Sequence, residues 1–194
     1  MQKIVIIDYG AGNVQSVKFA LERLGVAAIL SNDAAIIASA DKVIFPGVGE
    51  ASSAMKEVKK QGLDKVIPNL KQPVLGICLG MQLMCRHSDE GNTDCLGIFP
   101  LGVKKFMHDM KIPHTGWNEI VSLKGALFKE ISEKEFVYYV HSFFIEDSVF
   151  TIAKTDYGIP FAGAVQKDNF YACQFHPEKS GEVGQRILQN FLEI

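Results

Sequence analysis

The chain has little of what marks several large classes of protein. Its 194 residues carry 20 Lys and Arg against 22 Asp and Glu, a net charge of −2, and no basic block stands out. Binding of nucleic acid through a basic surface is therefore not expected. No apolar run approaches the ~20 residues of a membrane-spanning helix, and we find no repeat or low-complexity segment. We expect neither nucleic acid nor a membrane as a partner.

Cysteine is also scarce, and no two of the four cysteines form a Cys-x-x-Cys pair that would indicate zinc or a redox motif. No group of side chains has the spacing of a metal site, so we expect no metal and no cofactor. A reduced, cytoplasmic setting fits this cysteine usage. The sequence begins directly with a strand-like run, which predicts no signal peptide.

The composition, 47% hydrophobic and 22% charged, is that of an ordinary soluble globular protein. A chain of this length is most simply one domain, 1–194, that buries ~70% of its unfolded surface. The first half alternates strand-like and helix-like segments, as in a parallel, doubly wound sheet. Strands are predicted at 3–7, 26–30, 42–45 and 74–77, and helices at 14–24, 34–39 and 51–60.

The pattern changes after about residue 97. Short β-rich segments follow at 102–107, 119–123, 136–140, 151–154, 161–166 and 170–175, and an amphipathic helix at 180–192 closes the chain. The predicted fold is α/β, a flavodoxin-like, doubly wound and mostly parallel sheet with antiparallel β additions in the second half.

Two glycines flank a cysteine where a predicted strand meets a helix. Gly-Ile-Cys-Leu-Gly at 76–80 has the spacing of a nucleophile elbow, with the sulfur of Cys78 in place of a hydroxyl. Gly76 and Gly80 relieve crowding beside a strained residue. The following helix N-terminus favours the thiolate over the thiol. From this stretch alone, an inert core cysteine is an equal alternative.

A cysteine nucleophile needs a base, and the base needs a group that orients it. His176 ends the segment 170–175 and is followed by Pro177 and Glu178. Residues i and i+2 of an extended chain point the same way, so Glu178 can accept the second N–H of the imidazole. A surface loop with a chance His-x-Glu is the alternative. We interpret the histidines at three other positions as loop residues: His87, His108 and His114.

Acyl chemistry also needs donors for an oxyanion, each of which contributes ~2.7–4 kcal/mol to the transition state. One candidate is the backbone N–H of Leu79, directly after Cys78. Another lies in Pro-Gly-Val-Gly at 46–49, where Gly47 and Gly49 let the backbone approach a ligand. A plain turn is the alternative there.

Weaker polar candidates complete the predicted site. Gln82 lies one helical turn after Cys78, and Glu90 lies in a polar loop where it could meet an ammonium group or water. His141 and Ser142 end the segment 136–140 and could line a cleft. The remaining cysteines are interpreted as core or incidental residues: Cys85, Cys95 and Cys173.

With these motifs, the sequence resembles the class I (triad) glutamine amidotransferases. The elbow and Gln-Phe-His-Pro-Glu-Lys-Ser at 174–180 carry the resemblance. Four further segments resemble the glutaminase subunits of imidazole glycerol phosphate synthase, from histidine biosynthesis. They are Asp-Tyr-Gly-Ala-Gly-Asn at 8–13, Pro-Gly-Val-Gly at 46–49, Pro-His-Thr-Gly-Trp-Asn at 113–118 and Tyr-Tyr-Val-His-Ser at 138–142.

The resemblance implies that Cys78 attacks the carboxamide of L-glutamine, that His176 carries the proton and that Glu178 holds His176. A glutamyl thioester forms and water hydrolyses it. The resemblance also implies an oxyanion hole made by two backbone amides, which a partner's ligand brings into the productive orientation. It places further residues in these roles: Val48 and Leu79 in the oxyanion hole, and Gln82 and Glu90 in the glutamine pocket.

A separate cyclase subunit with a (β/α)₈ barrel fold is the implied partner. It would take the ammonia to convert phosphoribulosyl-formimino-AICAR phosphate into imidazole glycerol phosphate and AICAR. Asn13, Lys179 and Ser180 flank the cleft motifs, which makes them interface candidates, with solvated loop residues as the alternative.

Three other functions stay open at this point. A paralogous glutaminase could supply ammonia to a sugar- or polysaccharide-modifying synthase. A non-catalytic regulatory module could keep the same fold, although an intact Cys78, His176 and Glu178 argue against it. Another cysteine hydrolase on a doubly wound sheet is the third.

Overall fold

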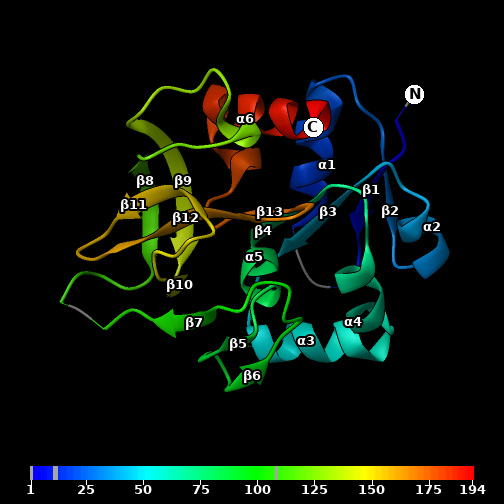
Figure 1. Cartoon of the computed structure of the whole chain (residues 1–194), viewed down its shortest axis with the longest axis horizontal. Helices are drawn as coiled ribbons and strands as arrows, with labels where there is room; N and C mark the ends of the chain where they lie inside the picture. The colour runs from blue at the N-terminus through cyan, green and yellow to red at the C-terminus, as the bar shows by residue number, and fades with distance from the viewer. Residues whose placement is uncertain (1, 11–12, 108) are drawn as a thin grey trace.

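The computed structural model describes residues 2–10, 13–107 and 109–194, and these ranges fold around one twisted, mixed β-sheet (Figure 1). Five of its described strands are parallel neighbours, and two more extend one edge in antiparallel fashion. From edge to edge the strands are β11 (Thr151–Asp156), β12 (Pro160–Lys167), β13 (Phe170–Cys173), β4 (Val74–Cys78), β3 (Lys42–Gly47), β1 (Ile4–Ile7) and β2 (Ala28–Ser31).

Helices cover both faces of this sheet, which is why its central strands are apolar on both sides. In β1, Ile4 and Ile6 pack into one core, and Val5 and Ile7 into the other. The first core lies under α1 (Val14–Arg23) and α6 (Gly181–Glu193), and the second under α2 (Ala34–Ala38), α3 (Ala51–Lys60), α4 (Leu63–Val66) and α5 (Leu79–Leu83).

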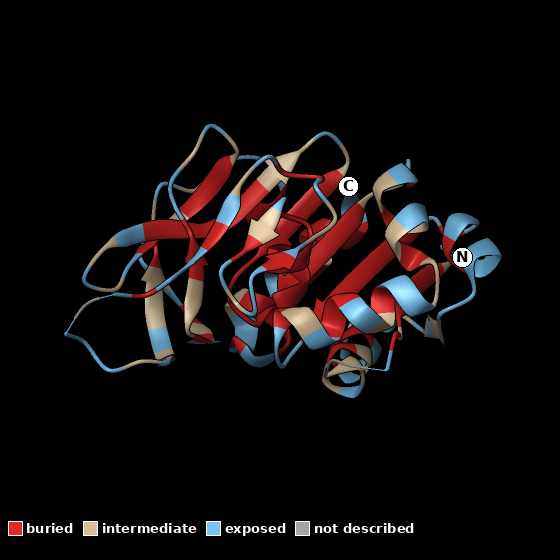
Figure 2. Ribbon diagram, turned by 90° about the horizontal axis from the view of Figure 1, so that it is seen from below, coloured by how far each residue is buried: buried red, intermediate tan, exposed pale blue. Residues whose placement is uncertain are grey.

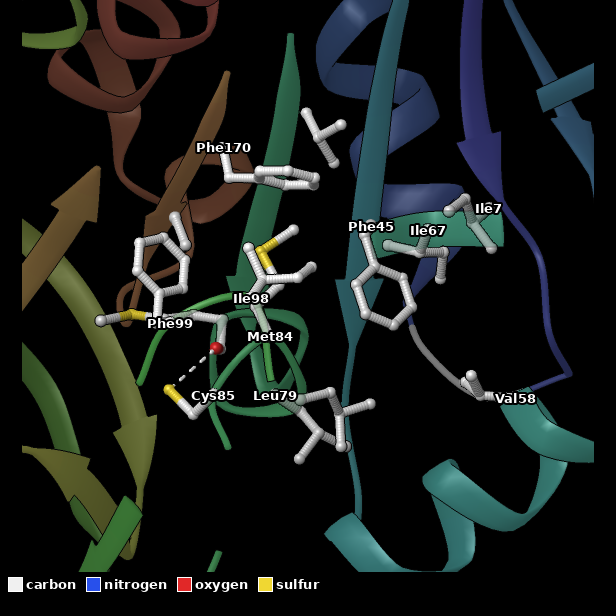
Figure 3. Close-up of a cluster of buried hydrophobic side chains, with 14 of the residues drawn as sticks. Ile7, Phe45, Val58, Ile67, Leu79, Met84, Cys85, Ile98, Phe99 and Phe170 are labelled. Atoms are coloured by element: carbon white, nitrogen blue, oxygen red, sulfur yellow. Dashed lines mark hydrogen bonds between the residues drawn. The ribbon is translucent and has the colours of Figure 1, made fainter. Parts of the chain in front are cut away.

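The side chains of the second core show how tightly α5 is held. Phe45, Leu79 and Met84 lie between the sheet and α3 to α5, and the sulfur of Cys85 contacts the carbonyl oxygen of Met81 (Figure 3). The buried residues concentrate in the sheet and on the inner helix faces, whereas the outer helix faces are exposed (Figure 2).

Two smaller sheets sit beside the main one. A hairpin pairs β8 (His114–Ile120) with β9 (Glu135–His141), and a four-stranded sheet has the order β10 (Phe143–Ile145), β7 (Gly102–Lys105), β5 (His87–Ser88) and β6 (Thr93–Asp94). Short 3₁₀ turns occupy η1 (Ile67–Asn69), η2 (Ala126–Phe128) and η3 (Pro177–Lys179). Within the described ranges, no helix has the length and apolar character needed to cross a membrane.

The predicted alternation of strands and helices is confirmed. The second half is antiparallel at β8–β9, β11–β12 and β12–β13, as predicted. The segment 170–175, predicted as an antiparallel addition, instead contributes β13, a central strand parallel to β4, and β5 also runs parallel to β7.

Asp and Gly are typical of helix starts and helix ends, and the sequence has Asp33 before the predicted helix 34–39 and Gly25 after the predicted helix 14–24; both act in this way. The side chain of Asp33 accepts hydrogen bonds from the first turn of α2, and Gly25 follows α1 with a φ of +76°. Of the other predictions, Ala11 and Gly12 of the first turn and the loop histidine His108 lie outside the described residues.

The main error concerns the strand predicted at 119–123. Only its first two residues are strand: they end β8, which already begins at His114 and stops at Ile120. The polar segment His-Thr-Gly-Trp-Asn hides this strand because only one face of the hairpin is buried. The strands β5, β6 and β10 are two or three residues long and give no readable sequence period.

The close approach of α5 to β3 makes a prediction about Gly80. A Cβ on Gly80 would overlap the carbonyl oxygen of Phe45. Gly80→Ala should therefore lower the free energy of unfolding by at least ~1–3 kcal/mol, since this overlap outweighs the ~1 kcal/mol that Ala offers a helix over Gly. Urea-induced unfolding of the full chain measures the change.

Gly102→Ala is the matched control, because no atom lies within 4 Å of the added Cβ. It should change the unfolding free energy by less than ~0.5 kcal/mol. Equal effects of the two substitutions would contradict the proposed packing constraint at Gly80.

Candidate functional site

Cys78 occupies the strained turn that the elbow spacing predicts. It ends β4 with φ 53° and ψ −109°, and α5 begins at the next residue. This backbone region is costly for a residue with a side chain, and such residues concentrate at functional sites. A Cβ on Gly76 would lie 3.1 Å from the amide nitrogen of Met81 and 2.9 Å from the sulfur of Met84, so Gly76 as well as Gly80 lets α5 pack closely.

The register of the central sheet brings other segments to Cys78. Gly47 of β3 pairs with Cys78, and Cys173 of β13 pairs with Ile77 of β4. Because the three strands are parallel, the residues that follow them meet at one edge of the sheet. Val48 therefore lies on one side of the cysteine and Gln174 on the other.

His176 and Glu178 form a buried pair at the same edge. The Nδ1–H of His176 donates to Oε1 of Glu178 across 2.8 Å, and 2% and 1% of the two side chains are exposed. A carboxylate that accepts from Nδ1 leaves Nε2 of the neutral ring as the proton acceptor. Nε2 is buried and has no well-aligned hydrogen bond with any described residue.

The pKa of His176 is set by opposing effects. Burial lowers the pKa, but the contacts with Cys78 and Glu178 outweigh burial and raise the pKa to about 10. The imidazolium is thus stabilised where a proton from the sulfur would arrive. This is the electrostatic arrangement that a cysteine–histidine nucleophile requires.

Backbone contacts hold this pair against the β8–β9 hairpin. The amide of His176 donates to the carbonyl oxygen of Tyr138 across 2.9 Å. The hydroxyl of Ser180 donates to the His176 carbonyl and accepts from the Tyr138 amide. Ser180 is only 1% exposed, so the prediction of Ser180 as a partner contact is wrong: its hydroxyl is used inside the site. Lys179 beside it is exposed.

A cavity of about 250 Å³ opens at this edge of the sheet. Both Cys78 and His176 line this cavity, together with most of the other site residues that the sequence predicts. Its lining comprises Val48, Gly49, Cys78, Leu79, Gln82, Glu90, Pro113, Val140, His141, Ser142, Phe143 and His176.

The oxyanion candidates border the cavity from two sides. Leu79 opens α5, so its N–H is one of the helix-end donors without an intrahelical partner. Val48 is half-exposed, and Gly49 has a φ of +97°. A Cβ on Gly47 would lie 2.8 Å from the amide nitrogen of Gly80, which explains why a glycine precedes Val48.

Gln82 reaches the cavity, but both of its N–H hydrogens are already used. Its Nε2 donates to the carbonyl oxygen of Phe143 and to Oε1 of Gln174, at 3.1 and 3.0 Å. Gln82 therefore offers a ligand only its carbonyl oxygen.

Glu90 is anchored at the other side of the cavity. Its Oε2 accepts the amide of Ala51 at the start of α3 across 2.7 Å. Burial raises the pKa of Glu90, against the hydrogen bond from Ala51 that lowers it. The other carboxylate oxygen remains for a ligand.

His141 lines the cavity as a neutral ring whose two nitrogens are engaged. Nδ1–H donates to the carbonyl oxygen of Phe143 across 2.8 Å, so Nε2 accepts from Nδ1–H of His114 across 3.0 Å. His114 in turn accepts from Asn118 and stacks on Tyr157. The prediction of His114 as a loop residue is wrong, since it is buried in β8.

Burial is the main reason that the pKa of His141 falls to about 3. With both nitrogens occupied, its ring acts as a wall of the cavity and not as a proton carrier. Ser142 beside it lines the cavity, as predicted.

The remaining candidates lie outside the cavity lining. Asn13 precedes α1 and accepts a hydrogen bond from Ser16. His87 lies in β5 next to Asp94. Cys85 and Cys173 are fully buried, and Cys95 is partly buried. No three His, Cys, Asp or Glu side chains of the described ranges group as metal ligands.

Gln174 is the residue that the sequence analysis missed. It is fully buried, and its Nε2 lies 3.7 Å from the sulfur of Cys78. Gln174 precedes His176 by two residues, so the extended-chain argument applied to His176 and Glu178 could also have found Gln174. Glu178 itself lies in the 3₁₀ turn η3 and not in an extended segment.

The geometry can be compared with known proteins. A family model described as glutamine amidotransferase class-I matches residues 5–194. The chain belongs to this family. The imidazole glycerol phosphate synthase subunit HisH of Bacteroides fragilis (strain YCH46) is 58% identical, over 99% of this chain and 100% of its own. The subunit of the same name from Vibrio parahaemolyticus is 47% identical, over 100% and 98%.

Solved structures support the fold. A crystal structure of a glutamine amidotransferase superposes with a TM-score of 0.77, covering 98% of this chain and 97% of that one, at 17% identity. The predicted fold class is therefore confirmed.

The buried, neutral His141 predicts a pH dependence of stability. Its folded pKa of about 3 lies below its ordinary value of 6.5. Its contribution to stability is therefore fully present above pH 6.5 and is lost as the pH falls towards 3. His141→Asn, which keeps a donor for Phe143, should lose less unfolding free energy between pH 7 and 4.5 than the natural chain, as measured by urea unfolding.

His87→Asn is the control. This half-buried ring lies outside the cavity, and its described hydrogen-bond partner is the exposed Asp94. Its pH profile should parallel that of the natural chain. The natural chain and the two variants share the same carboxylates, so the contribution of carboxylates to the pH dependence cancels in the comparison. Parallel profiles for all three would contradict the role of His141.

Proposed function

We propose that this chain is a glutaminase, the glutamine-hydrolysing subunit of an imidazole glycerol phosphate synthase. The observation that carries the proposal is Cys78 in its strained turn, facing the buried His176–Glu178 pair across one cavity. The names of relatives 45–58% identical along the full chain favour this pathway over a sugar-modifying synthase.

Acylation is the first step. His176 takes the thiol proton on Nε2, and the sulfur of Cys78 attacks the carboxamide carbon of L-glutamine. The tetrahedral intermediate collapses as the C–N bond breaks, and His176 returns the proton to the departing ammonia. Glu178 holds the imidazolium in place. A glutamyl thioester remains on Cys78.

Deacylation repeats the sequence with water. His176 accepts a proton from water as its oxygen attacks the thioester carbon. The S–C bond breaks, glutamate leaves and Cys78 regains the proton. The backbone amides of Leu79 and Val48 would stabilise the negative oxygen of each tetrahedral intermediate. Gly47 and Gly49 give the backbone on either side of Val48 its conformational freedom.

The polar groups that line the cavity suggest how glutamine is held. The free carboxylate oxygen of Glu90 can accept from the α-ammonium group. The carbonyl oxygen of Gln82 is a second acceptor, and the backbone and hydroxyl of Ser142 can reach the α-carboxylate side. His141 would contribute surface, because its ring nitrogens are engaged.

The ammonia needs a protected route, since it is mostly ammonium in water at neutral pH. We propose a cyclase subunit with a (β/α)₈ barrel docked over the cavity, which consumes ammonia to form imidazole glycerol phosphate and AICAR in the cytoplasm. Asn13 and the exposed Lys179 remain interface candidates. Two exposed apolar side chains of the cavity lining, Val48 and Val140, strengthen this face as a docking surface.

Replacement of the nucleophile tests the reaction. Cys78→Ala should lower the rate of glutamate release by ~10⁴-fold or more, because no thioester can form, while the circular dichroism spectrum is unchanged. Cys95→Ser is the control. Burial raises the pKa of Cys95 to about 11, and its thiol lies outside the cavity, so this variant should keep its activity. Retained activity in Cys78→Ala would refute the assignment.

A mixing assay tests the partner. The isolated chain should hydrolyse glutamine slowly, and addition of the cyclase with its nucleotide substrate should raise the rate by at least ~10-fold, the scale of a typical coupling free energy. Glutamate release is measured for the chain alone, with the cyclase, and with cyclase and nucleotide. Equal rates in all three would exclude activation by this partner.

A further inference from the structure

Gln174 contacts the reacting sulfur, yet no step described above uses it. It follows β13 directly, and the pairing of Cys173 with Ile77 sets it beside Cys78. Its side chain is fully buried, and its Nε2 lies 3.7 Å from the sulfur. A buried polar group in contact with a nucleophile needs an account of its own.

The hydrogen-bond network fixes which end of the Gln174 amide faces the sulfur. The carbonyl oxygen of Phe143 can only accept, so the Gln82 atom 3.1 Å from it is the NH₂ group. The second hydrogen of that group points to Gln174, 3.0 Å away, which must therefore accept through Oε1. The NH₂ group of Gln174 is left to face Cys78.

We propose that Gln174 is a further catalytic residue, which donates an N–H hydrogen bond to the sulfur of Cys78 and selectively stabilises its thiolate. The hydrogen bond to the Cys78 thiolate does not depend on what the protein does. Only its role in catalytic turnover rests on the proposed glutaminase function.

Two of the polar contacts of the sulfur, with Val140 and with Gln174, explain the selectivity. The thiol can donate to the carbonyl oxygen of Val140, 3.9 Å away. When the proton moves to His176, that contact loses its hydrogen. The contact with Gln174 gains a full negative charge on its acceptor, and charge-assisted hydrogen bonds are roughly twice as strong as neutral ones. Gln174 therefore favours the ionised state.

The same donor would act twice in one turnover. The thiolate is the attacking group during acylation and the leaving group when the S–C bond of the thioester breaks. In the thioester the sulfur is neutral, so the hydrogen bond is weakest between these two steps. Gln82, fixed by Phe143, keeps the donor aimed throughout.

Alkylation of the full chain with iodoacetamide tests the proposal without glutamine. The rate at Cys78 is followed against pH by mass spectrometry of the peptide. Gln174→Met removes the donor, and Gln174→Glu keeps the acceptor for Gln82 but places a carboxylate against the sulfur. Near neutral pH the rate should fall on the order of tenfold with Met and further with Glu, as the midpoint moves to higher pH.

Gln72→Glu is the matched control, because this amide donates to the carbonyl oxygen of Ile37, remote from the cavity. Its alkylation profile should be that of the natural chain. The other groups that face Cys78 are the same in every variant: Tyr9, Glu90, His141, Cys173, His176 and Glu178.

A measurement on the natural chain covers the case in which the Gln174 variants do not fold. The side-chain NH₂ signals of Gln174 in a ¹H–¹⁵N spectrum should shift with the same pH midpoint as Cys78 alkylation, and stay constant in Cys78→Ala. Unchanged alkylation midpoints in folded variants, or signals that do not follow the midpoint, would overturn the proposal. Midpoint shifts in a chain that releases no glutamate even with the cyclase and its nucleotide substrate would uphold Gln174 and reject the glutaminase.

Discussion

The structure depends on a close approach of three backbone segments around Cys78. Strand β4 ends in a left-handed residue, helix α5 starts at once, and β3 passes within contact of the first helical turn. No side chain fits at Gly47, Gly76 or Gly80 without displacing a neighbour. Two packed cores hold this arrangement, one on each face of the sheet. The strain at one residue is therefore balanced by burial spread over many.

Around this turn the polar groups form one connected chain. It runs from Asn118 through His114 and His141 to the carbonyl oxygen of Phe143, and from there through Gln82 and Gln174 to the sulfur. The carbonyl oxygen of Phe143 can only accept, so it fixes the donor and acceptor roles of His141 on one side and of Gln82 and Gln174 on the other. Buried networks of this kind are costly if one member is missing. The hairpin β8–β9 thus contributes to the orientation of the nucleophile as well as to the cavity wall.

Features that depend on residues close together in the chain could be predicted from the sequence, and features that depend on distant residues could not. Helices, caps and central strands depend on neighbours in the chain, and they were predicted closely, as Asp33 and Gly25 show. Cys78 and the contact between His176 and Glu178 were found because the glycine spacing around Cys78 and the short spacing from His176 to Glu178 are local signals. His114 and Ser180 were misread because both look like loop residues. Segments distant in the chain bury them: His114 stacks on Tyr157, and the hydroxyl of Ser180 bonds to the backbone of Tyr138 and His176.

By itself, the sequence determined the doubly wound fold, the elbow turn at Cys78 and the pairing of His176 with Glu178, since each depends on short periods or on glycine spacing. The tertiary structure decided what those residues contact. Sheet register placed Gln174 beside Cys78, although the two lie 96 residues apart in the chain. The network then turned Gln82 inward, leaving only its oxygen for a ligand. Pairing between distant strands depends on the whole set of packed layers, and no local pattern encodes it.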